Sequence, residues 1–312
     1  MQAVILAAGK GSRLQPLTLE RSKAMMPVAG KPMIARVMDL LKQAGLHEFI
    51  VVAHPQDHEL HNYFAADKNV TLAWQAERKG AAHALSCAAP YIQADFVLSA
   101  CDNLVSPDEA STFVRHFRSL LEQGQAGLLA LIRVPKEKLT SMGMVDWDGE
   151  IIQRIVEKPA LDSALSEVAS IPLYGFSQRF LGFLPLVKPS RRGELELQEA
   201  MQMLITETQG LHGEMLSGRQ TVTDASDLLA LNLHFLAQEK ADLRQWQQDG
   251  VLVIPPCLVE PGVEIAWGCS LGPNVMIETG AKIGKGAIIN NALVLRGAVV
   301  SDGEIVENSV FD

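Results

Sequence analysis

The stretch "VILAAGKGSRLQPLT", from Val4 to Thr18, decides how this chain is read. It opens with an apolar run typical of a strand that is buried on both faces of a parallel sheet. Ala7-Ala8-Gly9 follow, and then Gly11, Ser12 and Arg13. Small residues let a flat base or a phosphate chain lie against the backbone, whose N–H groups bind phosphate oxygens. Arg13 adds a permanent cation with several donors. The stretch therefore predicts a strand followed by a nucleotide-binding loop.

Two common phosphate loops do not match this pattern. The Rossmann dinucleotide motif requires a third glycine at the position that Leu14 occupies. The Walker motif fails around Gly30-Lys31, because Met25 stands where its first glycine belongs and Pro32 stands where Ser or Thr belongs. The loop is therefore of another kind.

Beyond the loop, strand and helix patterns alternate. Apolar runs bounded by turn residues predict strands, and apolar residues that recur on one face predict helices. The expected strands are 4–6, 48–53, one that ends at Asp102, "GLLALIRV", and a hairpin that turns on Asp148-Gly149. The expected helices are 31–44 (ended by Gly45), one opened by a Ser106/Glu109 capping box, and one at about 224–248. This alternation predicts an α/β fold with a mostly parallel sheet and helices on both faces.

A six-residue aliphatic repeat begins after Gly250. It places Val253, Val259, Ile265, Leu271, Ile277, Ile283 and Ile289 six residues apart, and Val294, Val300 and Val306 continue it after one five-residue step. Such a period is typical of a parallel β-helix, in which each aliphatic side chain stacks on its equivalent one coil away. We therefore expect two domains, residues 1–249 and a short β-helix of about three turns at 250–312.

Composition restricts the classes of function. The formal net charge of -9 disfavours binding to a nucleic-acid backbone. No apolar stretch is long enough for a membrane span, and no cationic leader precedes the first strand. The four cysteines have no metal-binding spacing, which indicates reduced thiols. We expect a soluble cytoplasmic protein.

Several segments together resemble one known family. "LAAGKGSRLQPLT" followed by "SKAMMPVAGKPM" resembles the signature of the sugar-1-phosphate nucleotidyltransferases, also called nucleotide-sugar pyrophosphorylases. "WQAERKGAAHAL" resembles the segment with which that family reads the base, although Ala81 replaces its usual Thr. "LSACDN" and "MGMVDWDGEIIQRIVEKP" resemble its metal-binding strand end and its sugar-binding segment. The resemblance implies a Rossmann-like catalytic domain and a left-handed C-terminal β-helix.

The resemblance also implies a reaction and a set of site residues. A nucleotidyl group would pass from an NTP to a sugar 1-phosphate, releasing pyrophosphate, with Mg²⁺ as the cofactor. Arg13 and Lys23 would act on the phosphates in catalysis. The implied nucleotide-binding residues are Leu6, Ala8, Gly9, Gly11, Ser12, Gln75, Gly80 and Ala81; the implied sugar-phosphate-binding residues are Gly143, Glu157, Lys158 and Tyr174.

The metal ligands and Tyr174 leave alternatives open. The resemblance implies Asp102 as a metal ligand, whereas the second ligand falls on Thr221, Thr223 or Asp224, of which we choose Asp224. The family's tryptophan is missing from that segment, "QTVTDASDLL". Tyr174 fits either the sugar pocket or a packed position beside a strand.

The substrates and the role of the coils also remain open at this stage. We favour UTP or dTTP with glucose 1-phosphate; the main rival is GTP with mannose 1-phosphate, as in a mannose-1-phosphate guanylyltransferase. A catalytically silent regulatory subunit and a nucleotide-sugar sensor are alternatives of another class. We expect the coils to form a homo-oligomer, so that deleting the chain after Gly250 changes assembly more than chemistry.

Overall fold

The computed structural model describes residues 1–160, 166–238 and 250–312. These residues form two compact units. One contains residues 1–10 and 37–220, and the other contains residues 11–36 and 221–312. We call them the sheet unit and the coil unit. No helix in the described part of the chain is long and apolar enough to cross a membrane.

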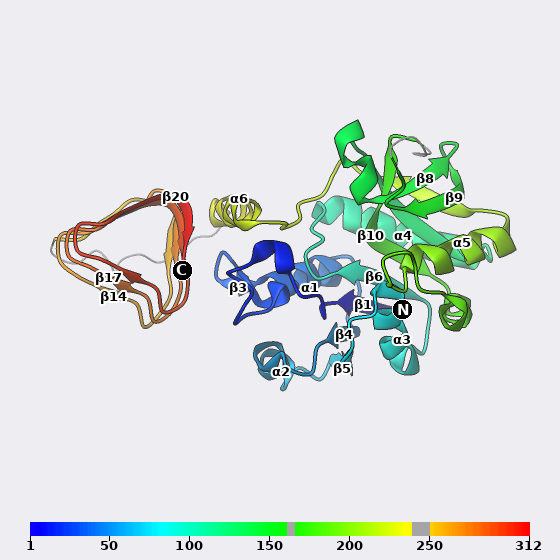
Figure 1. Cartoon of the computed structure of the whole chain (residues 1–312), viewed down its shortest axis with the longest axis horizontal. Coiled ribbons are helices and arrows are strands. Elements are labelled where there is room, and N and C mark those ends of the chain that lie inside the picture. The colour runs from blue at the N-terminus through cyan, green and yellow to red at the C-terminus, as the bar shows by residue number, and fades with distance from the viewer. Residues whose placement is uncertain (161–165, 239–249) are drawn as a thin grey trace. The chain divides into compact units, whose positions relative to one another are not determined.

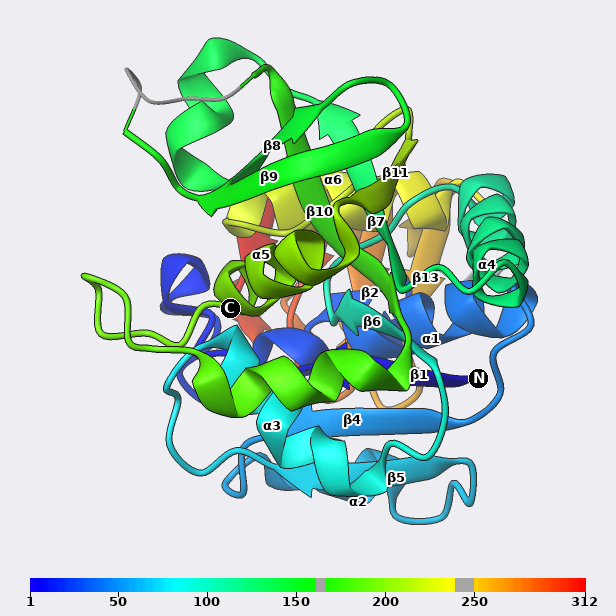
Figure 2. The same cartoon turned by 90° about the vertical axis from the view of Figure 1, so that its right-hand side faces the viewer.

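A mixed nine-stranded sheet forms the centre of the sheet unit (Figure 2). In spatial order its strands are β5 (Val70–Trp74), β4 (Phe49–Ala53), β1 (Gln2–Leu6), β6 (Phe96–Ala100), β10 (Val168–Phe176), β7 (Gly127–Arg133), β11 (Leu211–Met215), β9 (Ile151–Glu157) and β8 (Gly143–Trp147). The strands from β5 to β6 pair in parallel, as predicted. β10 runs antiparallel to β6 and β7, and β8 and β9 form the predicted antiparallel hairpin.

The helices of the sheet unit cover both faces, as predicted. They are α1 (Met33–Gln43), which starts in the coil unit, α2 (His58–Phe64), α3 (Ala81–Ala88), α4 (Pro107–Glu122) and α5 (Leu197–Thr208). Leu129 and Tyr174 pack with residues of α3 and α5 in one core cluster. Gly175, the next residue of β10, lies against the ring of Phe117 in α4. Since successive residues of a strand point to opposite faces, α4 covers the other side.

Of two local predictions, the capping box of one helix is confirmed and the start of another helix is wrong. The capping box of α4 is confirmed, because the Ser106 side chain and the Glu109 carboxylate each accept from the other's backbone N–H. The helix predicted over 31–44 begins later, at Met33. Lys31 and Pro32 instead form β3 (Lys31–Pro32), which pairs with β2 (Pro27–Val28) around a turn in which Ala29 and Gly30 both have positive φ.

Short 3₁₀ segments complete the sequence of elements. They are η1 (Ser12–Leu14), η2 (Lys23–Met25), η3 (Ala89–Tyr91), η4 (Lys136–Ser141) and η6 (Gln178–Leu186). η1 and η2 carry the predicted catalytic cations Arg13 and Lys23.

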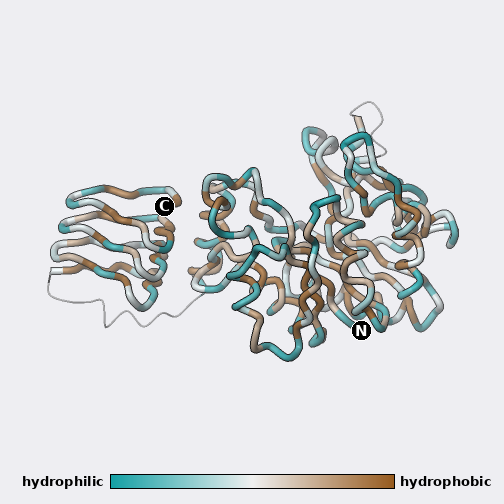
Figure 3. Tube along the Cα trace, turned by 60° about the horizontal axis from the view of Figure 1, so that its bottom comes forward, coloured by the Kyte–Doolittle hydropathy of each residue, from teal (hydrophilic) through white to brown (hydrophobic). Residues whose placement is uncertain are grey.

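The C-terminal residues form stacked parallel coils, seen end-on in Figure 1 and from the side in Figure 3. Their strands are β12 (Leu252–Val253), β13 (Cys257–Val259), β14 (Glu264–Ile265), β15 (Ser270–Leu271), β16 (Val275–Ile277), β17 (Lys282–Ile283), β18 (Ile288–Val294), β19 (Val299–Val300) and β20 (Ile305–Phe311). Val253 pairs with Leu271, which pairs with Ile289, which pairs with Val306, and all four are buried. The aliphatic repeat therefore forms the predicted ladder.

The coil unit also contains α6 (Ala225–Leu236), which packs against β18 and β20. The predicted helix over about 224–248 is confirmed up to Leu236, and residues 239–249 lie outside the described part of the chain. The predicted domain boundary near residue 250 falls at the edge of that gap.

Candidate active site

The loop after β1 is divided between the two compact units. In the sheet unit, the Ala7 N–H donates to the carbonyl of Val52 and the Leu6 carbonyl accepts from the N–H of Cys101. The Ala8 carbonyl accepts from Nε of Arg78 at 2.7 Å. Gly9 has no heavy atom within 4 Å of the position that a Cβ would occupy. The chain therefore holds Ala8 firmly and leaves open space in front of Gly9.

Gly11, in the coil unit, lies close to Thr18 and Lys23. Its φ is +61°, and its carbonyl accepts from the Leu14 N–H at 2.8 Å and from Oγ1 of Thr18 at 2.9 Å. A Cβ on Gly11 would meet Cβ of Lys23 at 3.2 Å. The structure thus brings Gly11 and Lys23 together, while Ser12 and Arg13 lie exposed in η1.

The predicted base-reading segment is fixed by a buried glutamine. Gln75 is only 4% exposed, and its Nε2 donates to the Gly80 carbonyl at 3.1 Å and lies 3.0 Å from Nδ1 of His83. A Cβ on Gly80 would lie 2.5 Å from the carbonyl oxygen of Leu195, so this position requires glycine. Ala81 is the first residue of α3. Gln75, Gly80 and Ala81 are therefore close together, as predicted.

The predicted sugar-binding residues meet across three strands. Gly143 in β8 pairs with Glu157 in β9 and with Ser170 in β10. A Cβ on Gly143 would lie 3.0 Å from Oγ of Ser170, 3.1 Å from Oε2 of Glu157 and 3.2 Å from Nε2 of Gln198. We call these four residues the Gly143 cluster. An added Cβ would press on all three polar groups, each of which would have to shift by a few tenths of an ångström.

Glu157 combines burial with neighbouring cations. Its carboxylate lies 3.5 Å from Nζ of Lys158 and 3.8 Å from the Arg192 guanidinium, which also pairs with Glu196 at 2.7 Å. Burial raises the pKa of Glu157 and the charge of Glu196 raises it further, whereas Lys158 and Arg192 oppose the shift. These side chains line a pocket of about 760 Å³ between β9 and the start of α5. The pocket offers both acceptors and cations to a ligand.

Tyr174 borders the Gly143 cluster from the core. It is 3% exposed, and its hydroxyl lies 3.4 Å from Oγ of Ser170. Burial raises the pKa of Tyr174 to about 12, and the charge of Glu157 adds to that shift. The packed alternative therefore accounts for the position of the ring, and contact with a sugar stays a prediction.

The two predicted metal ligands have different surroundings. Asp102 follows the end of β6 by two residues and is partly buried. Asp224 is exposed and caps α6, accepting from the N–H groups of Ser226 at 2.9 Å and Asp227 at 3.1 Å. The Ser226 hydroxyl, which donates to Oδ1 of Asp224 at 2.6 Å, and these N–H groups lower the pKa of Asp224. The cap explains why a side chain with an acceptor oxygen stands there, and a metal role for Asp224 stays a prediction.

The donor set at Asp102 suits Mg²⁺ with substrate ligands. Within the described residues, no group of three histidine, cysteine or acidic side chains is placed to hold a metal ion. Mg²⁺ commonly takes only one or two carboxylates and completes its shell with water and substrate phosphates. A carboxylate at a strand end therefore fits the ion.

Sequence reasoning missed three side chains near these sites: Arg78, Ser170 and Gln198. Arg78 bonds to the Ala8 carbonyl, and the other two belong to the Gly143 cluster. Arg78 stands inside the quoted segment "WQAERKGAAHAL", so a cation beside the predicted nucleotide site could have been recognised from the sequence. Ser170 and Gln198 gave no local signal, because strand pairing and the placement of α5 bring them to Gly143.

Two family models match this chain, and several known proteins are similar to it. The model of the family described as "Nucleotidyl transferase" matches residues 2–237, and that of "GMPPB C-terminal domain" matches residues 253–311. The UTP–glucose-1-phosphate uridylyltransferase AglF of Haloferax volcanii is 32% identical over 66% of this chain and 84% of its own. A glucose-1-phosphate thymidylyltransferase of Streptomyces griseus is 27% identical over 99% of this chain and 85% of its own.

Other relatives are longer, and a solved structure shares the fold. The bifunctional protein GlmU of Methanococcus maripaludis is 28% identical over 85% of this chain, which spans only 62% of that protein. A UDP-glucose pyrophosphorylase complexed with UDP-glucose superposes with a TM-score of 0.67 at 21% identity, over 76% of this chain and 99% of the other. Since the family model spans the described sheet, the loop after β1 and α6, this chain belongs to the nucleotidyl transferase family.

Proposed function

We propose that this protein transfers a nucleotidyl group from UTP or dTTP to glucose 1-phosphate. A phosphate oxygen of the sugar phosphate attacks the α-phosphorus, the bond from that phosphorus to the bridging oxygen breaks, and pyrophosphate leaves with the electron pair. The choice of substrates rests on the relatives named for UTP with glucose 1-phosphate and for thymidylyl transfer to it.

The Gly143 cluster is the observation that carries the proposal. It presents a carboxylate, a hydroxyl and an amide around a position without a side chain, next to the cations Lys158 and Arg192. Sugar hydroxyls require hydrogen-bonding partners, and a sugar's phosphate requires a cation. In our proposal Glu157 accepts from the sugar hydroxyls and Lys158 pairs with the sugar's phosphate.

The buried Gln75 supports a site for the base. Its Nε2 is directed to Gly80 and His83, so its Oε1 is the atom that we assign to the base. A carbonyl oxygen can accept from the N3–H of uracil or thymine. The backbone around Ala8 and Gly9 would lie against the nucleotide, because Gly9 leaves open space there.

Arg13 and Lys23 take their roles from the charge of the reaction. Both substrates are anions, and the leaving pyrophosphate gains negative charge, so cations fixed near the phosphates stabilise the transition state. We assign Arg13 to the β- and γ-phosphates and Lys23 to the α-phosphate and the incoming phosphate. Asp102 would hold Mg²⁺, with Asp224 as the proposed second ligand, and the bound ion would neutralise phosphate charge.

Pyrophosphate release over a grid of substrates tests the proposal. UTP, dTTP, GTP, CTP and ATP are each combined with glucose, N-acetylglucosamine, mannose and galactose 1-phosphates, with and without Mg²⁺. We expect turnover with UTP or dTTP and glucose 1-phosphate only when Mg²⁺ is present. Turnover with GTP and mannose 1-phosphate would establish the rival enzyme. Nucleotide binding with no turnover in any combination would refute catalysis and favour the silent subunit or sensor.

Assembly is a separate part of the proposal. Stacked coils end in exposed strand edges, which pair readily with a second copy, so we propose a homo-oligomer through residues 250–312. Light scattering after size-exclusion chromatography tests this, and a monomeric chain at micromolar concentration would contradict it.

A further inference from the structure

The segment 11–36 carries Arg13 and Lys23, and we call it the basic segment. It follows β1 directly in the sequence, yet it belongs to the same compact unit as α6 and the coils. Contacts far apart in the sequence must therefore hold it, and three sets of such contacts are present.

A buried ion pair forms the first set. Nη1 of Arg21 lies 2.9 Å from both carboxylate oxygens of Glu278, which follows β16 in the coils. The Arg21 and Glu278 side chains are only 10% and 7% exposed. The N–H of Arg296, one coil further, donates to Oε2 of Glu278 at 3.1 Å. A buried pair that is hydrogen-bonded this well has a defined geometry, and loss of one partner leaves an uncompensated charge.

Helix α6 and the first coils provide the other two sets. Nδ2 of Asn232, a residue 1% exposed, donates to the Pro27 carbonyl at 2.8 Å, and its Oδ1 accepts from the Ala29 N–H at 2.8 Å. The Gly30 N–H lies 3.4 Å from the sulfur of Met276, in β16. The later half of the basic segment is therefore held by both α6 and the coils.

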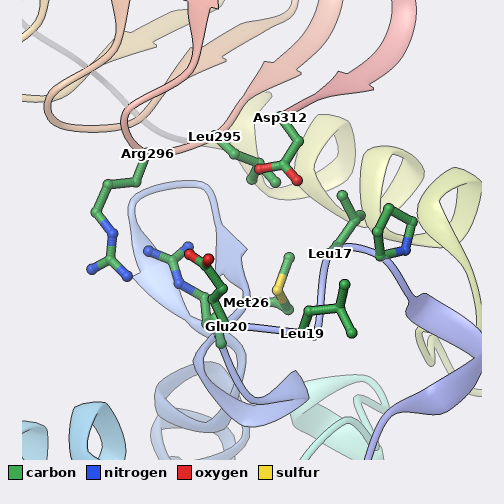
Figure 4. A pocket seen from close by; sticks show the side chains of 9 residues that line it. Leu17, Leu19, Glu20, Met26, Leu295, Arg296 and Asp312 are labelled. Atoms are coloured by element: carbon green, nitrogen blue, oxygen red, sulfur yellow. The ribbon is translucent and has the colours of Figure 1, made fainter.

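The basic segment is loosely packed against the coils near Arg21. A cavity of about 190 Å³ lies there, lined by Pro16, Leu17, Leu19, Glu20, Arg21, Met26, Leu295, Arg296 and Asp312 (Figure 4). Leu19 is 69% exposed. Arg21 stands between Arg13 and Lys23, so its pair with Glu278 holds this part of the basic segment to the coils.

We propose that Glu278 is a positioning residue, which fixes the segment carrying Arg13 and Lys23 through its ion pair with Arg21. The coils then take part in the reaction as well as in assembly. The kinetic part of this inference rests on the proposed function, whereas the ordering of the basic segment does not. A loosened segment would misplace two cations that act only when correctly oriented toward the phosphates.

The first test compares Glu278→Gln with Glu264→Gln in the full chain. Glu264 is a matched control, because it also lies in the coils and pairs with a lysine, Lys282, at 3.4 Å on the surface. Hydrogen–deuterium exchange without ligand is followed in peptides covering residues 14–31. We expect exchange at least about tenfold faster in Glu278→Gln and unchanged in Glu264→Gln, because only the former pair anchors the basic segment. Equal exchange in both variants would overturn the inference.

The second test is kinetic. We expect Glu278→Gln to lower kcat by about ten- to a hundredfold and to change the KM of either substrate much less, because Arg13 and Lys23 act on the phosphates in the transition state. Glu278→Asp should recover part of the activity. A rise in KM with kcat unchanged, or no recovery with Asp, would overturn positioning in favour of a merely structural role.

Two further outcomes keep the test decisive. If Glu278→Gln does not fold, the double variant Arg21→Gln/Glu278→Gln removes both charges, and the same exchange and kinetic results are expected of it. If the wild-type protein shows no turnover with any substrate pair, the proposed function fails, but the exchange result still confirms or overturns the anchoring of the basic segment.

Discussion

Gly9 offers a direct test of the nucleotide loop, because the fold itself does not require a glycine there. Its φ is not in the left-handed region, and no heavy atom lies within 4 Å of an added Cβ. Replacing such a glycine with alanine stabilises proteins by about 0.4–1 kcal/mol, since the unfolded chain loses freedom. For a chain of 312 residues we expect the Tm of Gly9→Ala to rise by up to about 1.5 °C.

Activity should change in the opposite direction. A ligand atom that bonds to the backbone approaches to about 2.7–3.2 Å, whereas a methyl carbon holds atoms at about 3.5–4.0 Å. An added Cβ would therefore displace the nucleotide by up to about 1 Å, and such a misplacement can lower the rate about a hundredfold. We expect kcat/KM for the NTP to fall by about that factor while the protein stays folded.

Gly182→Ala is the matched control. Gly182 is exposed in η6, has no positive φ and likewise has no heavy atom within 4 Å of an added Cβ. Both variants are assayed for pyrophosphate release and for thermal unfolding by circular dichroism. If Gly9→Ala keeps kcat/KM within about twofold of wild type, the backbone at Gly9 does not contact the nucleotide. If it unfolds, the reasoning about open space is wrong.

Three other variants, with Gly124→Ala as a control for one of them, test separate roles of single residues. Lys23→Ala should lower kcat far more than it raises KM, since its charge acts on the transition state; a change in KM alone would contradict its role. Gly80→Ala should destabilise the fold by about 2–5 kcal/mol in urea unfolding, because φ is +108° and the added Cβ meets the Leu195 backbone at 2.5 Å. Gly124→Ala, with φ +78° and no close neighbour, should cost only about 1–2 kcal/mol, and equal losses would contradict the contact with Leu195. The pKa of Tyr174 is about 12 in the fold against an ordinary 10.0, so stability present below pH 10 is lost toward pH 12, by about 2–3 kcal/mol; Tyr174→Phe should remove that part of the loss, and an unchanged pH profile would refute it.

The sequence predicted the elements whose causes are local. The capping box at Ser106 needs only residues of its own first turn, and the hairpin turn needs only Asp148, which accepts from the N–H groups of Glu150 and Ile151, and Gly149 with φ +112°. The coil ladder is also local, because each coil repeats the same short strand and turn. A period of six residues therefore predicted its register.

The sequence did not predict contacts that depend on strand order. Gly143 was recognised from a motif, but its neighbours Ser170 and Gln198 come from β10 and from α5. They reach Gly143 because β10 lies antiparallel beside β7 and β8. The pattern of apolar residues along the chain does not reveal that strand order. The start of α1 was misplaced for another reason, a local hairpin that competes with the first helical turn. Pro32 fits the first turn of a helix, yet the turn at Ala29-Gly30 lets Lys31-Pro32 pair with β2.

The coils show what a sequence repeat alone leaves out. A repeat predicts stacking and exposed ends, and from these we expected assembly, with little effect of residues 250–312 on chemistry. The Arg21–Glu278 pair gives those residues a second task, because it joins them to the segment that carries Arg13 and Lys23. Deleting the coils would remove assembly and anchoring together, so a loss of activity could not be assigned to either. Glu278→Gln separates them, since it leaves the ladder of aliphatic residues intact and removes the charge and one of the two acceptor oxygens that Arg21 contacts.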